Sequence, residues 1–311
     1  MKTTSLPDLT TPPEASVVTV GNFDGVHRGH AALIFEVVRK ARESSRTSIV
    51  VTFDPHTRTV VSPGEPLPIL TTLQEKALII ERLGVDLLVW IPFDATFARI
   101  DARQFAREIL AGRLGAQEWV MGEGHGFGHD RSGNDNLLRT ALGEKHFSVS
   151  VSRLVLGAGT PVSSTEVRAR VVGGKLAEAV DLLGHPYAIV ARRETGEGKG
   201  RQLGFPTLNF AHPLPPKVVP PSGVYAARLQ VGREEALGAL YFGDCPTTGK
   251  RPTHFEFFAF KMPDREPPVG ENACLWVYDR VRPDKQFASF GELTDQIAHD
   301  VSYIKRFFQG V

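Results

Sequence analysis

The chain has 311 residues, of which 41% are hydrophobic and 23% charged, as in a soluble globular protein with room for two domains. Its 36 Lys and Arg against 35 Asp and Glu leave a formal net charge of +1. This charge creates no strong electrostatic field that by itself would attract nucleic acid or an acidic membrane. With only two cysteines and no apolar run of membrane-spanning length, we expect a cytoplasmic protein without a disulfide scaffold. The Pro- and Thr-rich segment 1–18 predicts a loose lead-in and no signal peptide.

Strands and helices alternate in the first part of the chain. Apolar runs predict strands and amphipathic runs predict helices. The expected strands are 16–23, 47–53, 85–93, 118–122 and 147–156, and the expected helices are 29–45, 73–84, 102–115 and 134–145. This order predicts an open α/β sheet, in which ligands bind at the carboxyl ends of the strands.

The amino-acid composition and the kind of predicted element change near residue 184. Two short helices, 164–174 and 175–184, precede a part rich in Gly, Pro and short strands. The expected strands there are 187–193, 223–231, 236–243, 254–262 and 273–281, and an amphipathic helix, 290–308, closes the chain. The pattern predicts a small antiparallel β-barrel followed by a C-terminal helix. We therefore expect two domains, 1–183 and 184–311.

The stretch GNFDGVHRGH, residues 21–30, joins the first expected strand to the first expected helix. A helix N-terminus attracts phosphate through its unpaired N–H groups, and His27 and His30 face the same way on the first turn. Both imidazoles could stabilise charge in a phosphoryl or nucleotidyl transfer. The expected phosphate-binding residues of this stretch are Gly21, Asn22, Phe23, Asp24 and Gly29.

Three simpler interpretations of the same stretch remain open. Asn22 or Asp24 could cap the helix, since both residue types are favoured N-caps. The two histidines could lie on the surface. Asp24, His27 and His30 also share a spacing that would suit a metal, although the sequence offers no clear further ligand.

A second candidate anion site is PVSSTEVRARVV, residues 161–172. Ser163 and Glu166 have the spacing of a capping box. Ser164 and Thr165 would present hydroxyls at the helix N-terminus, and Arg168 would hold a phosphate with its fork of donors. The capping and anion-binding interpretations are compatible.

A third candidate site is the Gly-rich TGEGKGRQLGFPTLNF, residues 195–210. It is not a Walker P-loop, but a Gly-rich turn with cations can cradle phosphate. Thr207 and Asn209 stand two residues apart, so on a strand their oxygens face one side and suit Mg²⁺. The expected phosphate-binding residues of this stretch are Gly198, Gly200, Arg201, Gly204 and Pro206.

These stretches, together with VVTFDPH, LTTLQEKALIIERLGVD and SSTEVR, resemble in order and spacing the bifunctional bacterial riboflavin kinase/FMN adenylyltransferase family, also called FAD synthetases. The resemblance runs from about residue 17 to the end. It implies a Rossmann-like nucleotidylyltransferase domain that converts FMN to FAD, and a riboflavin kinase barrel that makes FMN. It also implies ATP, riboflavin and FMN as small-molecule partners, Mg²⁺ with ATP, and catalytic roles for His27, His30 and Arg168. Neither nucleic acid nor a membrane is an expected partner.

The chain departs from the family pattern at two places. Gly124 and His125 replace an Asp or Asn and a Phe in a loop that, in the family, serves the flavin side of the adenylyltransferase site. In the strand 254–260, His254 stands where the resemblance places a catalytic Glu, and Glu256 follows two residues later on the same face. Glu256 could act as the base after a small shift of register, His254 could act instead, or the kinase could be impaired.

Two other functions therefore remain open. The chain could be an FMN adenylyltransferase whose barrel binds flavin or nucleotide without phosphorylating it. It could also be a flavin- or nucleotide-sensing protein without catalysis, although the intact HRGH and GFPTLN stretches argue against a pure binder.

Overall fold

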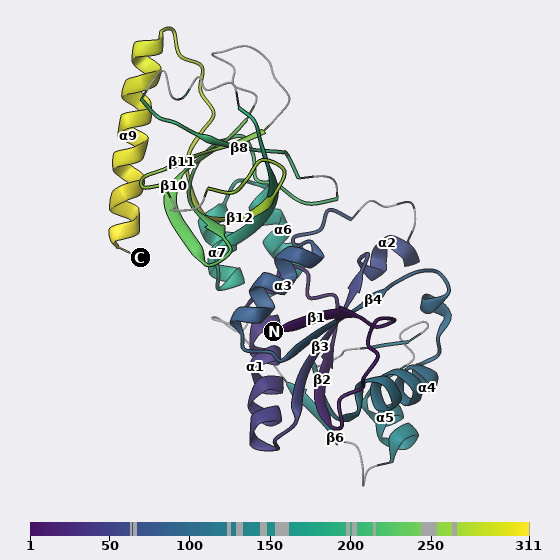
Figure 1. Ribbon diagram of the computed structural model, residues 1–311. Helices are drawn as coiled ribbons and strands as arrows, with labels where there is room; N and C mark the ends of the chain where they lie inside the picture. Colours follow the sequence, from purple (N-terminus) through teal and green to yellow (C-terminus); the bar gives the residue numbers. More distant parts are fainter. Residues whose placement is uncertain are drawn as a thin grey trace. The chain divides into compact units, whose positions relative to one another are not determined.

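The computed structural model describes residues 1–62, 64, 67–122, 126–128, 133–143, 148–152, 162–196, 200, 204–213, 216–243, 254–262 and 266–310 (Figure 1). Contacts divide the chain into two compact units, Met1–Ser164 and Thr165–Val311. This division falls before the expected boundary at residue 184 because α7 (Leu176–Leu183) packs against barrel strands. The boundary at 184 stays a prediction from the sequence.

The first unit is built on a six-stranded sheet in the order β1-β4-β3-β2-β5-β6, and every neighbouring pair is parallel. The strands are β1 (Lys2–Ser5), β2 (Ser16–Val20), β3 (Thr47–Asp54), β4 (Leu87–Pro92), β5 (Ala116–Gly122) and β6 (Ser148–Ser152). From β2 the chain proceeds outward to β3 and β4 on one side, and later to β5 and β6 on the other. The carboxyl end of β2 is therefore the switch point at which such sheets bind ligands.

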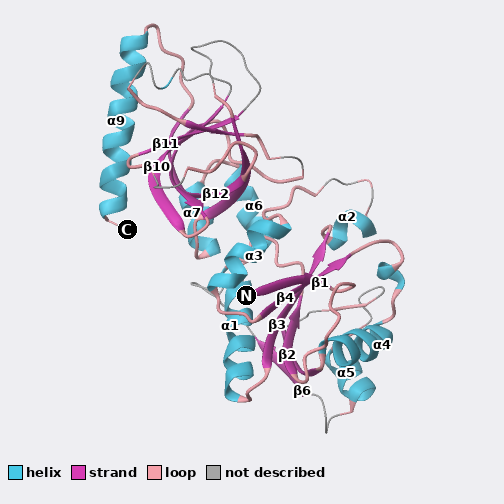
Figure 2. Cartoon of the chain, in the orientation of Figure 1, coloured by secondary structure: helices cyan, strands magenta, loops and turns pink. Residues whose placement is uncertain are grey.

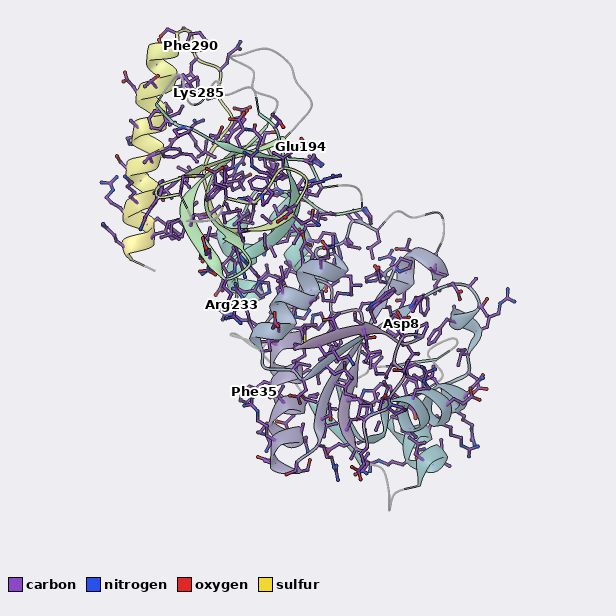
Figure 3. All side chains as sticks on the ribbon, in the orientation of Figure 1. Asp8, Phe35, Glu194, Arg233, Lys285 and Phe290 are labelled. Carbon is purple, nitrogen blue, oxygen red and sulfur yellow. The ribbon has the colours of Figure 1, made fainter. Side chains whose placement is uncertain are left out.

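Helices accompany this sheet (Figure 2). They are α1 (Arg28–Glu43), α2 (Thr57–Val61), α3 (Leu73–Arg82), η1 (Phe97–Arg99), α4 (Ala102–Gln104), the π-helix η2 (Phe105–Arg113) and α5 (Asp135–Leu142). One face of α1 packs Val37 and Ala41 against Val17 and Val120 of the sheet. The other face is open, and Phe35, 64% exposed, points away from the sheet in Figure 3.

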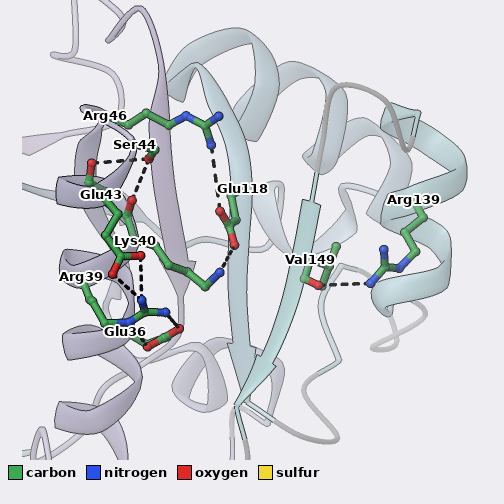
Figure 4. A network of polar contacts seen from close by, with 10 residues as sticks. Glu36, Arg39, Lys40, Glu43, Ser44, Arg46, Glu118, Arg139 and Val149 are labelled. Atoms are coloured by element: carbon green, nitrogen blue, oxygen red, sulfur yellow. Dashed lines mark hydrogen bonds and ion pairs between the residues drawn. The ribbon is translucent and has the colours of Figure 1, made fainter.

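An ion pair joins α1 to the sheet as well. Lys40 Nζ lies 2.7 Å from Oε1 of the largely buried Glu118 on β5 (Figure 4). Arg46 lies 4.0 Å from the other oxygen of the same carboxylate. Two cations thus compensate the cost of burying Glu118. One of them, Lys40, attaches the C-terminal half of α1 to the sheet.

Several elements differ from the sequence prediction. The expected loose lead-in contains β1, which pairs in parallel with β4 at the edge of the sheet. The expected helix 102–115 is α-helical only to Gln104 and then continues as a π-helix. The short helix α2, capped by His56, was not predicted.

The second unit is a closed barrel in the order β10-β11-β8-β7-β12-β9, with antiparallel neighbours throughout. Its strands are β7 (Tyr187–Glu194), β8 (Leu208–Phe210), β9 (Gly223–Val231), β10 (Glu234–Gly243), β11 (His254–Ala259) and β12 (Asn272–Pro283), accompanied by α6 (Ser164–Val172), α7 and the C-terminal α9 (Phe290–Gln309). Aromatic side chains fill the core: Tyr187, Phe210, Tyr225, Phe255, Phe257 and Trp276 are fully buried. The predicted fold class, a Rossmann-like α/β domain followed by a barrel and a helix, is confirmed.

The C-terminal helix α9 is tied to the barrel by one buried carboxylate. Asp300 is 3% exposed, and its Oδ2 accepts a hydrogen bond of 2.8 Å from Arg282 Nε on β12. Gln296 donates to the other oxygen over 2.8 Å. Apolar contacts of Ile304 with Val224 and Ala226 complete the attachment.

Candidate active sites

The segment that follows β2, residues 21–27, forms a strained turn at the switch point of the sheet. Phe23 and Val26 have φ angles of 47° and 43°, a region that bulky and β-branched residues rarely adopt. Such residues cost about 1–3 kcal/mol each and persist only where neighbouring groups hold them. Gly25, at φ 83°, supplies the one position where the left-handed conformation is free of strain.

Long-range hydrogen bonds hold this turn. Oδ1 of the buried Asp24 accepts from the backbone N–H groups of Leu70 and Thr71, at 2.7 and 3.1 Å. Thr71 Oγ1 in turn accepts from Gly25 N at 2.9 Å. The Asn22 side chain donates to Thr57 Oγ1 and accepts from Thr57 N, at 2.9 and 3.1 Å. Neither Asn22 nor Asp24 caps α1, so that interpretation of the sequence is wrong.

His27 is itself the N-cap of α1. Its Nδ1 accepts a hydrogen bond of 3.3 Å from His30 N, and the residue is only 5% exposed. An acceptor Nδ1 carries no proton, so the neutral ring bears its N–H at Nε2, where it can donate to a ligand. The rings of His27 and His30 are stacked, with centroids 3.7 Å apart, as their spacing on the first turn predicts. His27 is therefore buried at the site, which contradicts the interpretation as a surface residue.

Gly29 makes the position of His27 possible. A Cβ at residue 29 would lie 2.9 Å from His27 Cε1 and 3.0 Å from its Nδ1, too close for the ring to stay where it is. The sequence predicted Gly29 as a place for phosphate to approach the backbone. The structure gives the glycine a further purpose, which is to leave room for the capping imidazole.

His30 is an uncharged imidazole with a buried, unsatisfied nitrogen. Its Nδ1 has no hydrogen-bond partner among the described residues, and the edge of the ring meets Phe23, 5.2 Å away between centroids. Burial holds the pKa of His30 well below 6.5, and electrostatic interactions with His27 and Lys76 lower it further. At neutral pH the ring therefore has one N–H donor and one free acceptor.

Sequence reasoning missed Lys76, on α3. Its Nζ donates to Thr52 Oγ1 at 2.9 Å, and Thr52 Oγ1 lies 3.2 Å from the carbonyl oxygen of Asn22 in the turn. Burial lowers the pKa of Lys76 to about 8, while Asp24 and Asp54 oppose the shift. The sequence places Lys76 on the amphipathic helix that follows LTT, and nothing in that helical pattern predicts a buried lysine there.

The stretch that forms the second candidate anion site contains the residue at which the chain divides, Ser164. Ser164 Oγ donates to the carbonyl oxygen of Asp24 at 2.8 Å, which brings the start of α6 to the turn. Ser163 precedes that helix, whereas Thr165 and Arg168 belong to the second unit and lie on α6. Phosphate contacts of these four residues, and the capping box of Ser163 with Glu166, stay predictions.

The barrel brings the Thr207 and Asn209 pair next to Glu256. Thr207 Oγ1 donates to Glu256 Oε2 at 3.2 Å, and Asn209 on β8 pairs directly with Glu256 on β11. The pairing of β11 with β8 covers Phe255, Glu256 and Phe257, and His254 lies just beyond it, paired with Gly243 of β10. The pairing register therefore brings Thr207, Asn209 and Glu256 together. His254 lies two residues before Glu256 on the same strand.

Two glycines of the Gly-rich stretch close over this cluster. A Cβ at Gly196 would lie 2.0 Å from Asn209 Nδ2, and a Cβ at Gly200 would lie 3.2 Å from Thr207 Oγ1. Gly196 was not among the predicted residues. Gly204 adopts φ 84°, as a turn glycine does, and Pro206 directly precedes Thr207. Gly198, Arg201, Gly124 and His125 lie outside the described residues.

Within the described ranges, no group of three or more His, Cys, Asp or Glu side chains is arranged to hold a metal ion. Asp24, whose Oδ1 already accepts two backbone N–H groups, does not form such a group with His27 and His30 there. None of the helices in the described part of the chain is both long and apolar enough to cross a membrane.

Comparison with known proteins identifies two parts of the chain as well. Residues 9–166 match the family model described as FAD synthetase, and residues 183–308 match the one described as riboflavin kinase. The bifunctional riboflavin kinase/FMN adenylyltransferase of Escherichia coli K12 is 33% identical over 96% of this chain and 94% of its own length. The Bacillus subtilis protein of the same name is 32% identical over 95% and 93%.

A solved structure resembles the chain as well. It is titled a macrolide-efflux protein from Streptococcus pneumoniae, and it is 28% identical, with a TM-score of 0.78 over 96% of this chain and 97% of its own. The likeness supports the two-part fold described above. Because one family model spans half of the chain and relatives match nearly all of it, this chain belongs to the bifunctional riboflavin kinase/FMN adenylyltransferase family.

Proposed function

We propose that this chain phosphorylates riboflavin to FMN in its second unit and adenylylates FMN to FAD in its first, with ATP as the donor in both steps. The relatives' names and the two family models support both activities. The observation that carries the assignment in the barrel is the contact of Glu256 with Thr207 beside Asn209. The low cysteine content of the chain favours the cytoplasm as the compartment in which both reactions take place.

In the adenylyl transfer, a phosphate oxygen of FMN attacks the α-phosphorus of ATP, and the bond to the pyrophosphate oxygen breaks. The nucleophile is already an anion near neutral pH, so the site must position groups and stabilise charge rather than remove a proton. His27, through Nε2–H, and the uncharged His30 supply donors for the phosphate oxygens. Ser163, Ser164, Thr165 and Arg168 are proposed as further phosphate ligands.

In the kinase step, the 5′-hydroxyl of riboflavin attacks the γ-phosphorus of ATP and must lose its proton. We assign Glu256 as the base that accepts this proton, because it lies on the strand face that carries Asn209 and touches Thr207. His254 lies beyond the part of β11 that pairs with β8, which supports Glu256 over His254. Between the alternatives that the sequence left open, the geometry favours Glu256.

The residues of the barrel site fit Mg²⁺ bound together with ATP. Thr207 and Asn209 offer hard oxygen donors, and Gly196 and Gly200 keep the space beside them free of side chains. The ion would neutralise phosphate charge there. The Gly-rich residues Gly198, Gly200, Arg201, Gly204 and Pro206 are proposed as the phosphate-binding loop.

Two substitutions test the assignment of the base. Glu256→Gln keeps the shape and removes the carboxylate, so we expect riboflavin phosphorylation to fall roughly 10²- to 10⁴-fold while FMN adenylylation is unchanged. His254→Ala is the matched control on the same strand, and it should keep most of the kinase rate. Chromatography of products formed from riboflavin or FMN with Mg-ATP measures both steps.

The reverse result, with His254→Ala inactive and Glu256→Gln active, would make His254 the base. If the unsubstituted protein converted FMN but never phosphorylated riboflavin, the barrel would be a binding module and only the adenylyltransferase assignment would stand.

A further inference from the structure

Lys76 is a buried cation linked to the 21–27 turn, and neither proposed reaction gives it a role. It is 5% exposed, and its ammonium donates to Thr52 Oγ1 at 2.9 Å. Thr52 then donates its own hydroxyl proton to the carbonyl oxygen of Asn22, at 3.2 Å. A hydrogen-bonded chain thus runs from α3, through Thr52 near the carboxyl end of β3, to the backbone of the turn that precedes His27.

Burying the charge of Lys76 costs folding free energy. Burial lowers its pKa to about 8, and the nearby carboxylates of Asp24 and Asp54 offset only part of that penalty. An apolar side chain of similar length would fill the same space without burying a charge. A residue that costs stability and lies beside two histidines of a phosphate site is a candidate for a functional role.

The charge of Lys76 also acts on His30. Burial is the largest cause of the low pKa of His30, and electrostatic interactions with His27 from the same turn and with Lys76 from α3 lower it further. Asp24 and Asp54 are the acidic groups that face Lys76, and Asp24 is already engaged by two backbone N–H groups. The balance leaves His30 as a neutral ring stacked on His27 at 3.7 Å, a distance at which two charged rings would repel each other.

We propose that Lys76 is a positioning residue for adenylyl transfer, which fixes the 21–27 turn, and with it His27 and His30, through the hydroxyl of Thr52. The charge of Lys76 in addition disfavours a proton on His30. The inference deepens the proposed FMN adenylyltransferase activity and rests on it. A neutral His30 keeps a nitrogen acceptor and a single directed N–H, so that the developing charge on ATP meets a ring in one fixed protonation state. The turn must hold His27 and His30 to a fraction of an ångström for this purpose.

The test is Lys76→Met, with Lys2→Met, which removes an exposed lysine of β1, as the matched control. We expect kcat for FMN adenylylation to fall roughly 10- to 100-fold with a smaller change in KM, while riboflavin phosphorylation by the same chain stays the same. The His30 resonances in an NMR titration should move to a higher pKa, and the acidic limb of kcat should move with them. Lys2→Met should change neither.

Thr52→Val separates the two effects, since it breaks the link to the turn and keeps the ammonium. It should slow adenylylation without raising the pKa of His30, and it also serves as the deciding variant if Lys76→Met does not fold. Full adenylylation activity in Lys76→Met, or an unchanged His30 titration in that variant, would overturn the inference. If the proposed function itself were wrong, the unsubstituted chain would form no FAD from FMN. The NMR titration would then still test whether Lys76 affects the pKa of His30.

Discussion

At the scale of single residues, Gly29 shows how a missing side chain leaves room for the His27 ring. A Cβ at this position would meet the His27 ring at 2.9 Å. We therefore expect Gly29→Ala to push the ring out of its capping position and to slow FMN adenylylation roughly 10- to 100-fold, measured as FAD formed per enzyme. Gly64→Ala is the control, because nothing lies within 4 Å of its added Cβ. Equal rates for the two variants would contradict the role given to Gly29.

The buried Lys76 makes a prediction about stability and pH. Its pKa falls from 10.5 in the unfolded chain to about 8 in the folded one, so between these values the unfolded state holds the extra proton. The free energy of unfolding should therefore rise with pH across this window, by up to about 3 kcal/mol, and this contribution is lost as the pH falls to 8. Denaturant unfolding of the unsubstituted protein and of Lys76→Met at pH 8 and 10 measures it, since groups common to both cancel. A rise of equal size in both proteins would show that Lys76 is not its source.

Sequence reasoning succeeded for residues whose roles are local. His27 and His30 stand three apart on one helical turn, and that spacing alone predicts that they face the same way. The roles of Asp24 and Lys76 depend on partners far along the chain, such as Leu70, Thr71 and Thr52. No pattern within the motif contains those contacts, so the cap by His27 and the role of Lys76 became visible only in the fold.

At the scale of elements, the register between β8 and β11 favours one of the two candidates for the base that the strand sequence left open. Glu256 and His254 share a face by their spacing, and only the pairing of Asn209 with Glu256 distinguishes them. Likewise, β1 is stabilised by pairing with β4, about eighty residues later, and its own Pro- and Thr-rich surroundings predicted a loose segment. Elements with a strong internal period, such as α1, α3 and α9, were predicted within a few residues of their observed ends.

The attachment of α9 gives a prediction at the same scale. Asp300→Ala leaves the guanidinium of Arg282, whose side chain is 18% exposed, without its carboxylate partner. We expect the second unit to lose about 3 kcal/mol of unfolding free energy, because one half of a buried pair remains uncompensated. Asp295→Ala, at an exposed position of the same helix, should change stability by a few tenths of a kcal/mol at most. Denaturant melts followed by circular dichroism compare the two, and similar losses would refute the role of the pair.

At the scale of the whole molecule, two active sites in one chain predict that defects in them are separable. His30→Ala should accumulate FMN from riboflavin, since its kinase site is intact. Glu256→Gln should convert added FMN to FAD and leave riboflavin unchanged. A mixture of the two variants should form FAD from riboflavin, because FMN released by one can diffuse to the other. No FAD from the mixture, when each variant performs its own step, would mean that FMN does not pass through solution.

The most direct measurement is a chromatographic analysis of the products that the unsubstituted protein makes from riboflavin and from FMN with Mg-ATP. The account predicts that riboflavin yields FMN first and FAD afterwards, and that FMN yields FAD with release of pyrophosphate. If neither flavin reacted with ATP, the assignment of flavin to both sites would be contradicted, and the stacked histidines of the first unit would have to serve another phosphorylated acceptor.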